Sequence, residues 1–304
     1  MMGFVAMVLV VLVYAANFVA VRYSVQHGLT SFDLAALRFA AAGVLLLPYL
    51  FTIGIRDLGG IGWRRGLTLA CLAGAPYSVV FFLGMSRAPA AHGAVLNPGL
   101  VPSVVFLVLV ALGRDVFSSR RALSLALIVV GLVLVTQTAF TTRGEMLAGD
   151  ALLLATGVSW GLFTVLLRLW DVRPLQAAAI VSVISMVYLP AYFALWYHGV
   201  AASVPHMIGQ AILQGVFNSA IAIILLTFAV RRLGAQIAAL FSPAIPVLTT
   251  LLAIPLLGEV PTPAQWMGVL IVFAGMLSAA MPRSVRLSAF ARHEPRPSCG
   301  EIEP

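Results

Sequence analysis

The sequence predicts an all-α integral membrane protein with ten transmembrane helices, arranged as two inverted-topology five-helix repeats. Its composition, a series of long apolar runs and a repeated order of residues predict this fold. Of the 304 residues, 62% are hydrophobic and 9% are charged, whereas soluble domains have about 45–50% apolar and about 25% charged residues. A soluble fold of this size needs more polar surface than this chain can supply. The composition therefore excludes a soluble enzyme, a disordered protein and a disulfide-stapled secreted domain.

Ten apolar runs are each long enough to cross a bilayer, which takes about 20 residues. The first run has no basic residue before it and continues to Arg22, so we expect a retained helix and not a cleaved signal peptide. The predicted spans are residues 3–21, 33–53, 66–85, 91–111, 122–139, 148–168, 174–197, 207–229, 234–257 and 263–281.

The distribution of Arg predicts the orientation. All 18 basic residues are Arg, and they lie between apolar runs, so we expect no nucleic-acid partner despite the positive net charge. If the N-terminus is cytoplasmic, most Arg residues fall in cytoplasmic loops or the C-terminal tail, while Arg22, Arg87 and Arg143 lie outside. The positive-inside rule therefore predicts a cytoplasmic N-terminus and C-terminus. Residues 282–304, rich in Arg, Pro and Ser, are expected to form a disordered cytoplasmic tail.

The two halves of the chain share an order of residues at a nearly constant separation. Residues 14–22 match 160–168 at a separation of 146 positions, and three later residues recur 144 positions on. The three pairs are Pro102 with Pro246, Asp115 with Glu259, and Gly131 with Gly275. We therefore predict repeats at 1–140 and 147–281. Because five is an odd number of spans, the second copy must be inverted, which is typical of secondary transporters with a site between the repeats.

Several motifs occur in the order in which one family has them. They are Tyr14, Asn17, Phe18 and Arg22 in the first span, Ala36-Leu37-Arg38-Phe39 in the second, Gly74–Ser78 followed by Ala91–Ala94, and Pro246 followed by Gly258-Glu259. Through these motifs the chain, up to about residue 281, resembles the drug/metabolite transporter superfamily in its ten-helix EamA-type branch. The first half departs from the family pattern at Asp115, where Glu is usual.

The resemblance implies that the protein moves small metabolites across a bacterial inner membrane. It also implies alternating access through a central cavity between the two halves. Within the superfamily, the YddG-type exporters of aromatic amino acids are the leading candidate for the subgroup that this chain resembles.

Polar side chains inside spans are costly and face the protein interior, so they are the candidates for a substrate pathway. Two of these residues have a second interpretation besides substrate binding. Asn17 is interpreted equally well as a hydrogen-bonding contact between helices, and His92 is interpreted as a histidine whose partners are other protein groups. Gln214 and Asn218 lie one turn apart on one face. The predicted substrate-binding residues are Tyr14, Asn17, Tyr77, Ser78, His92, Asn97, Trp160, Phe163, Thr164, Gln214, Asn218 and Ser242.

Proline occurs at matching places in the fourth span of each half. A proline inside a helix removes one backbone donor and frees a carbonyl one turn earlier. Interrupted helices at matching places in two repeats indicate a transporter site. We therefore predict helix breaks or hinges at Pro98, Pro102, Pro243 and Pro246.

No carboxylate falls in the centre of a predicted span. Because proton- and sodium-coupled carriers commonly place one there, we expect facilitated diffusion or loosely coupled exchange. Arg38 is the one charge that looks buried in a span, away from the span ends, and it is interpreted as structural, either extending to the membrane surface or paired with Asp33. A cavity of neutral polar and aromatic groups suits a small amphipathic zwitterion or an aromatic solute.

Two other interpretations remain open. One is a broad-specificity exporter of drugs or cationic compounds with the same fold, and the other is a membrane-embedded lipid-modifying enzyme or a scaffold. The sequence has no nucleophile spacing and no P-loop, and Cys71 and Cys299 have no metal-ligand spacing. We therefore predict no catalysis, no metal and no cofactor. The expected partners are a small-molecule substrate and the lipid bilayer, with the protein a monomer or weak dimer.

Overall fold

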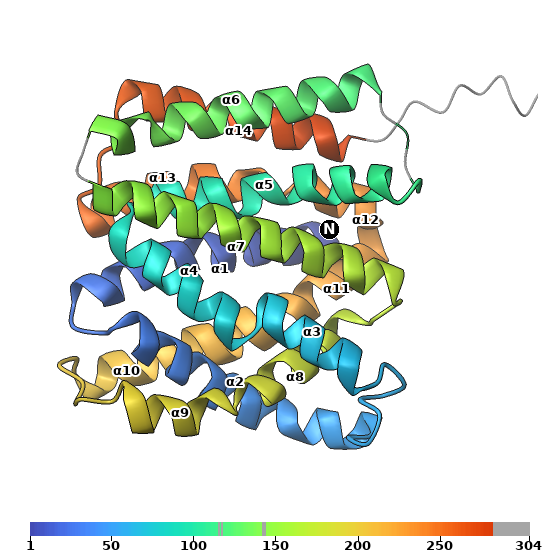
Figure 1. The fold of residues 1–304 in the computed structure, drawn as a ribbon. Coiled ribbons are helices and arrows are strands. Elements are labelled where there is room, and N and C mark those ends of the chain that lie inside the picture. Colours follow the sequence, from blue (N-terminus) through green and yellow to red (C-terminus); the bar gives the residue numbers. More distant parts are fainter. Residues whose placement is uncertain (115, 117, 142–143, 282–304) are drawn as a thin grey trace, which may run out of the picture.

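A computed structural model of the chain describes residues 1–114, 116, 118–141 and 144–281, and its regular structure in that part is entirely helical (Figure 1). Ten helical stretches of the described chain are long and apolar enough to cross a membrane. This confirms the predicted fold class. The predicted disordered tail at 282–304, together with Asp115 and Arg143, lies outside the described residues.

The first half of the chain forms five spans from six helices. They are α1 (Met2–Gln26), α2 (Ser31–Ile53), α3 (Trp63–Ala73) with α4 (Ala75–Arg87), α5 (Ala90–Ala111) and α6 (Ser119–Thr141). The second half forms five more spans. They are α7 (Gly144–Leu169), α8 (Pro174–Ser185) with α9 (Tyr188–Leu195), α10 (Val204–Ala211) with η1 (Ile212–Ile221) and α11 (Ala222–Leu233), α12 (Ala235–Ala239) with α13 (Ala244–Leu257), and α14 (Pro263–Ala280).

The third span of the first half breaks between α3 and α4 at Gly74. Pro76 lacks a backbone donor, and the N–H of Ala75 donates to Ser185 Oγ at 3.0 Å instead of to a helix carbonyl. A side chain at position 74 would collide with α8, because its Cβ would lie 2.3 Å from Ser185 Oγ. Glycine here therefore lets α8 supply the hydrogen bond that the break needs.

The third span of the second half also departs from α-helix, in the π-helical segment η1. A π-helix widens the turn, is rare in proteins and is frequently found at functional sites. Gly215 lies in η1 directly against α2, where an added Cβ would come 2.3 Å from Ala41 Cβ. The apolar periodicity of the sequence did not predict this segment, which carries two of the predicted site residues, Gln214 and Asn218.

Of the four predicted proline breaks, only Pro243 lies where the helix is interrupted, and Pro246 lies in the first turn of α13. Helix α5 continues without interruption through Pro98 and Pro102, whereas the chain leaves helix between α12 and α13, just before and at Pro243. Helix α7 packs closely along α5, and a Cβ at Gly157 would lie 2.9 Å from the Asn97 carbonyl oxygen. Neighbouring helices that pack this closely can compensate for the backbone hydrogen bond that a proline removes inside a span.

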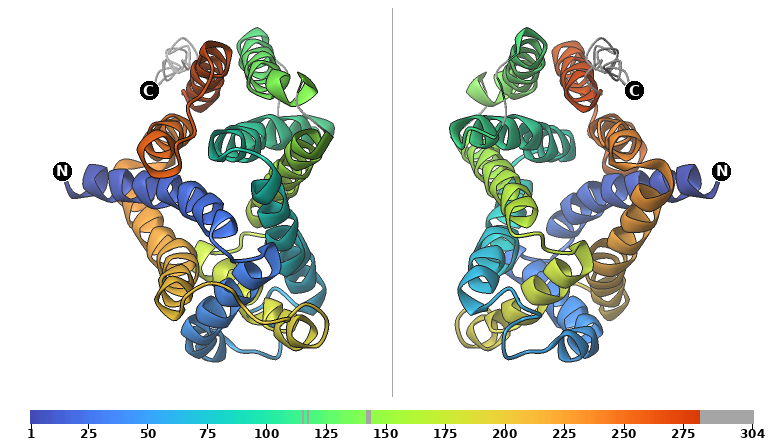
Figure 2. Two further views of the ribbon diagram at one scale, coloured as in Figure 1. Left: turned by 90° about the vertical axis from the view of Figure 1, so that its left-hand side faces the viewer. Right: turned by 90° about the vertical axis from the view of Figure 1, so that its right-hand side faces the viewer.

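The helix contacts are related by exchange of the two halves. Helix α1 packs on α11 and α13, and its counterpart α7 packs on the equivalent helices α4 and α5. The last span of each half, α6 and α14, pack on each other at one edge of the molecule (Figure 2). Gly131 and Gly275, which the repeat relates, allow this approach, since a Cβ on either would lie within 3 Å of the facing helix.

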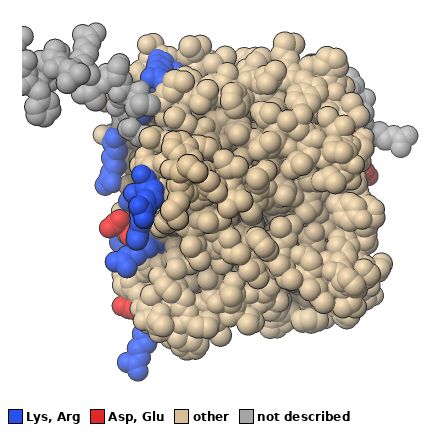
Figure 3. Space-filling view, turned by 180° about the vertical axis from the view of Figure 1, so that it is seen from behind, with Lys and Arg blue, Asp and Glu red and all other residues tan. Residues whose placement is uncertain are grey.

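The two ends of the helix bundle differ in charge. Arg side chains gather along one edge of the molecule (Figure 3). The start of α3, the end of α7 and the end of α11 lie together at one end of the bundle (Figure 1), and these segments contain Arg64, Arg168, Arg231 and Arg232. We call this the Arg-rich end. The end of α1 and the start of α5 lie at the opposite end.

Candidate functional site

A cavity of about 290 Å³ lies between the two halves of the chain. Helices α5 and α6 line it from the first half, and α7, α14 and the turn between α12 and α13 line it from the second. Arg121 and Arg168 are part of its wall and belong to helix ends at the Arg-rich end. Of the predicted site and hinge residues, Pro102, Thr164, Ser242 and Pro243 line this cavity.

A second group of predicted residues forms a cluster, which we call the aromatic cluster, of Tyr77, Asn97, Trp160 and Phe163. The Asn97 amide donates to the Tyr77 hydroxyl at 3.1 Å and to Thr156 Oγ1 at 2.8 Å. The Trp160 ring centroid lies 5.4 Å from that of Tyr77 and 5.2 Å from that of Phe163. Helices α4, α5 and α7 therefore bring these side chains together, with both amide protons of Asn97 used inside the protein.

Thr164 connects the cavity with the aromatic cluster. Its hydroxyl donates to the carbonyl oxygen of Trp160 at 2.8 Å, one turn earlier on α7, while its side chain is part of the cavity wall. The aromatic cluster therefore begins one helical turn beyond this wall, in the direction away from the Arg-rich end.

A third group consists of polar side chains on α1, α2, α4 and η1, and we call it the polar junction. These helices contact one another in pairs, α1 and α2 each packing on both α4 and η1. Within the described part of the chain, several of their buried polar atoms have no hydrogen-bond partner. These atoms are Asn17 Oδ1, Arg38 Nε, Ser78 Oγ, both amide atoms of Gln214, and Asn218 Oδ1. Nearly all buried polar groups of proteins are paired, so a cluster of exceptions indicates a place for polar contacts with something other than the protein.

Two contacts establish how α1 lies against the eighth span, which consists of α10, η1 and α11. Ser24 Oγ lies 2.9 Å from His206 Nε2, and Gln210 Nε2 donates to the Ala20 carbonyl at 3.4 Å. The two spans are therefore antiparallel, and one further turn along each places Asn17 level with Gln214. The next turn places Tyr14 level with Asn218. The predicted residues of these two spans therefore lie at similar depths along the bundle, on helices that pack on each other.

Arg38 also belongs to the polar junction, and of the two structural roles expected for it, the pairing with Asp33 is not formed among the described residues. Asp33 closes the capping box of α2, accepting from the Thr30 N–H at 2.8 Å, and its other oxygen accepts from the Tyr192 hydroxyl. The Arg38 Cζ instead lies 5.7 Å from the Phe39 ring centroid, and α2 packs on α4, which carries Tyr77, and on η1, which carries Gln214.

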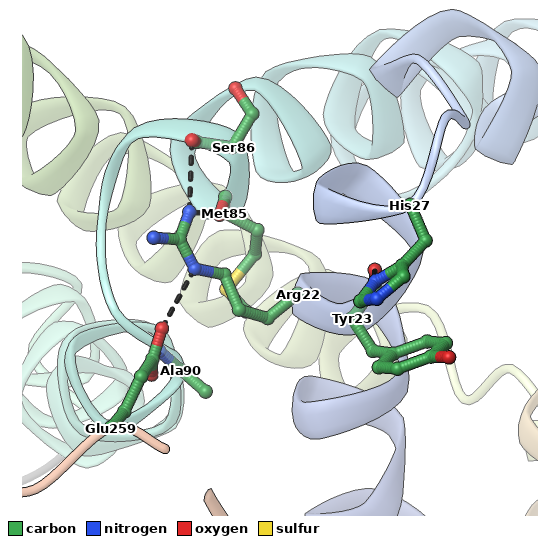
Figure 4. Close-up of polar contacts among 7 residues, drawn as sticks. All are labelled: Arg22, Tyr23, His27, Met85, Ser86, Ala90 and Glu259. Carbon is green, nitrogen blue, oxygen red and sulfur yellow. Dashed lines mark hydrogen bonds and ion pairs between the residues drawn. The ribbon is translucent and has the colours of Figure 1, made fainter. Parts of the chain in front are cut away.

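The opposite end of the bundle is held by an ion pair between the two halves (Figure 4). Arg22 Nε donates to Glu259 Oε1 at 2.9 Å, and Arg22 Nη1 donates to the carbonyl oxygens of Met85 and Ser86, each at 2.9 Å. Glu259 Oε2 in turn accepts from the N–H of Ala90 at 2.7 Å. These contacts join α1, the end of α4 and the start of α5 to the end of α13.

His92 lies at this opposite end and contacts two other helices. Its Nδ1 is 2.8 Å from Asp150 Oδ1, and its Nε2 is 3.0 Å from the side-chain amide nitrogen of Gln265. Because an amide nitrogen can only donate, Nε2 accepts, so Nδ1 carries the proton and donates to Asp150. Both ring nitrogens are therefore engaged by α7 and α14, which matches the interpretation of a histidine satisfied by the protein and leaves no ring nitrogen for a substrate.

Sequence reasoning missed Thr156 and gave Arg38 too little weight. Thr156 lies four residues before Trp160, so helical spacing alone places both on one face of α7. Arg38 could have been found from its position, because a charge inside a span is usually functional. The partners of His92 lie 58 and 173 positions away in sequence, and no local pattern indicates them.

Ten apolar spans with polar side chains in their interior define a multi-pass integral membrane protein. The chain belongs to the EamA-like transporter family, whose profile matches residues 1–137 and, separately, residues 147–281. It is therefore a membrane transporter by family, and its family points away from the enzyme interpretation.

Relatives over most of the chain are also named as transporters. An uncharacterized transporter of Archaeoglobus fulgidus is 24% identical over 276 residues, covering 88% of this chain and 93% of that protein. The uncharacterized transporter YyaM of Bacillus subtilis is 26% identical over 280 residues, covering 87% and 89%. A solved crystal structure with 18% identity matches 91% of this chain and 96% of its own at a TM-score of 0.60, which shows the similarity of fold.

Proposed function

We propose that the protein is a secondary transporter that exports small metabolites by alternating access, with aromatic or neutral amino acids as the first substrates to test. The observation that carries this proposal is the difference between the two ends of the interface between the halves. At the Arg-rich end the interface contains the cavity, and at the opposite end the Arg22–Glu259 contacts hold it together. Such a protein is open to one side of the membrane and closed to the other.

The order of groups along the interface supports an amphipathic solute. The cavity wall carries the Thr164 and Ser242 hydroxyls, the aromatic cluster begins one turn further along α7, and the polar junction adjoins that cluster on α4. Aromatic faces bind apolar or aromatic side chains, and a few polar groups fix the orientation of a ligand. The acids Asp33, Asp150 and Glu259 all lie at span ends in bonded positions, which favours facilitated diffusion or loosely coupled exchange.

The charge asymmetry supports the orientation. With the Arg-rich end in the cytoplasm, the positive-inside rule is satisfied, and the N-terminus and C-terminus are both cytoplasmic. In a bacterial inner membrane the cavity then opens to the cytoplasm, as loading of an exporter requires.

The test is transport by purified protein in liposomes. We expect counterflow of labelled L-phenylalanine, L-tryptophan or L-threonine above that of empty liposomes, with little dependence on a pH gradient. Trp160→Ala should reduce this flux at least tenfold, because it removes the ring between Tyr77 and Phe163. The matched control is Trp63→Ala, which changes an exposed tryptophan at the start of α3 and should leave the flux unchanged.

Two results would overturn this assignment. Absence of counterflow for a panel of all neutral amino acids would exclude the substrate class. Competition by cationic dyes with no effect of amino acids would instead favour the broad-specificity drug exporter.

A further inference from the structure

We propose that the polar junction binds the head group of a zwitterionic amino acid, with Arg38 holding the carboxylate and the amide oxygens of Asn17, Gln214 and Asn218 receiving the ammonium group. This inference deepens the proposed function and rests on it for the identity of the solute as an amino acid. The carboxylate contact itself is a separate claim about Arg38.

The first step concerns the charge of Arg38. A guanidinium stays protonated in proteins, and an unpaired charge inside a span is expensive. Arg38 forms no ion pair with the residues that the structure describes, and its Nε has no hydrogen-bond partner there. Asp33, on the same helix, is already bonded to Thr30 and Tyr192. The junction therefore holds one positive charge that the described protein does not balance.

The second step concerns what surrounds this charge. Its Cζ lies 5.7 Å from the Phe39 ring centroid, and α2 packs on α4, which carries Tyr77 and Ser78, and on η1, which carries Gln214 and Asn218. These groups are neutral, so they cannot neutralise a guanidinium. A carboxylate can, and guanidinium binds it through two parallel hydrogen bonds.

The third step concerns the remaining unpartnered atoms. Gln214 Nε2 is a buried donor on η1, on the helix that packs directly against α2, and it is available to a carboxylate oxygen. The oxygens of Asn17, Gln214 and Asn218 are acceptors without partners in the described chain. Hydrogen-bond acceptors on helices that pack around the Arg38 guanidinium match a solute that has an ammonium group next to its carboxylate. This combination is found in an α-amino acid.

The fourth step connects the head group to the side chain. Ser78 of the polar junction and Tyr77 of the aromatic cluster are neighbours on α4, and the Tyr77 ring centroid lies 5.4 Å from that of Trp160, so the two groups adjoin. A solute whose charged head lies at Arg38 can place an aromatic or apolar side chain against Trp160 and Phe163. The geometry thus accounts for both parts of an aromatic amino acid.

The experiment compares three probes that differ only in their charged groups. They are L-phenylalanine, 3-phenylpropionate, which lacks the ammonium group, and phenethylamine, which lacks the carboxylate. We measure binding to the purified full chain in detergent from the shift of the thermal unfolding midpoint with probe concentration. We expect L-phenylalanine to bind best, 3-phenylpropionate to bind more weakly, and phenethylamine to bind at least tenfold more weakly than L-phenylalanine.

Variants of the junction then test Arg38 directly. Arg38→Gln should weaken binding of both carboxylate probes at least tenfold without changing phenethylamine, and Arg38→Lys should restore part of the loss. Gln214→Leu should weaken the binding of L-phenylalanine by less than Arg38→Gln does. The control is Arg64→Gln, an exposed Arg at the start of α3, which should bind as the wild type does. If Arg38→Gln does not fold, the comparison of the three probes on the wild-type protein decides whether binding requires the carboxylate.

The outcomes separate this inference from the proposed function. If amino acids neither bind nor move but 3-phenylpropionate or L-lactate binds in an Arg38-dependent manner, the substrate class fails and the carboxylate site stands. Equal binding of phenethylamine and L-phenylalanine overturns the inference, as does unchanged carboxylate binding by folded Arg38→Gln or failure of every carboxylate probe to bind.

Discussion

The two ends of the interface between the halves are built from different chemistry. At the opposite end, directional contacts join the halves: Arg22 binds Glu259, and His92 binds Gln265 of α14. At the Arg-rich end, the same two halves leave a cavity of about 290 Å³. The main helix contacts repeat when the halves are exchanged, but α5 packs on α1 and α14, whereas the equivalent packing of α13 on α7 and α6 is weak in the described chain. The two ends therefore differ in how closely the halves approach each other, as well as in the side chains that join them.

The comparison also shows how a repeat can diverge. The fourth span is continuous in α5 but broken between α12 and α13, although both copies have prolines at these places. The break borders the cavity, where Ser242 and Pro243 form part of the wall. The unbroken α5 supports the aromatic cluster through Asn97. One copy thus supplies a rigid helix and the other an interrupted one on facing sides of the pathway.

The largest effect is expected from removing the ion pair at the opposite end. Arg22→Ala leaves Glu259 unpaired and frees two carbonyl oxygens at the end of α4. We expect a loss of about 2 kcal/mol of stability, less than for a fully buried pair because both side chains are partly exposed. Transport should fall as well. The measurement is thermal unfolding together with counterflow, and unchanged values for both would show that this contact does not close the end.

The next largest effect is expected at the aromatic cluster. Asn97→Ala removes the donor to both the Tyr77 hydroxyl and Thr156, which costs about 1–3 kcal/mol for buried groups left unpaired. Transport should fall at least tenfold while membrane insertion is retained. Tyr77→Ala and Asn218→Ala should also reduce flux. If these variants and Trp160→Ala all keep normal counterflow, the pathway does not pass through the cluster.

A smaller effect on transport is expected at His92, where the change falls on stability. His92→Phe removes the hydrogen bonds to Asp150 and Gln265 and leaves a buried carboxylate with one partner fewer, so we expect a loss of about 1–3 kcal/mol. The apparent KM for transport should stay within twofold of the wild type in protein that remains folded. A tenfold change in KM would instead assign His92 to the substrate pathway.

The smallest effect is expected at the cavity wall. Thr164→Val keeps the shape of the side chain but removes the hydroxyl that bonds the Trp160 carbonyl. Stability should change by less than about 1 kcal/mol, since the bond is local, and KM should rise about threefold at most. A second variant at the same position, Thr164→Trp, tests whether the cavity lies on the pathway, because a large ring in the cavity should block transport. Normal flux in that variant would place the pathway elsewhere.

Much of the candidate site was predictable, because polar residues inside spans must face protein or water. Helical spacing placed Trp160 with Phe163, and Gln214 with Asn218, before any contact was known. The contact of Asn97 with Tyr77 and Thr156 was not predictable, since it joins three helices whose relative rotation no local pattern encodes. The same is true of His92, whose role depends on two distant partners.

The amino-acid sequence was sufficient for the ten spans, for their division into two inverted sets and for the concentration of Arg at one end of the bundle, because hydropathy, repeat spacing and loop charge are local properties of the chain. The tertiary structure was needed for the π-helical turn at Gln214, for the continuity of α5 through its prolines and for the isolation of Arg38 from Asp33. These features depend on how closely neighbouring helices approach and which side chain reaches a partner first, and both are settled only when distant segments pack together.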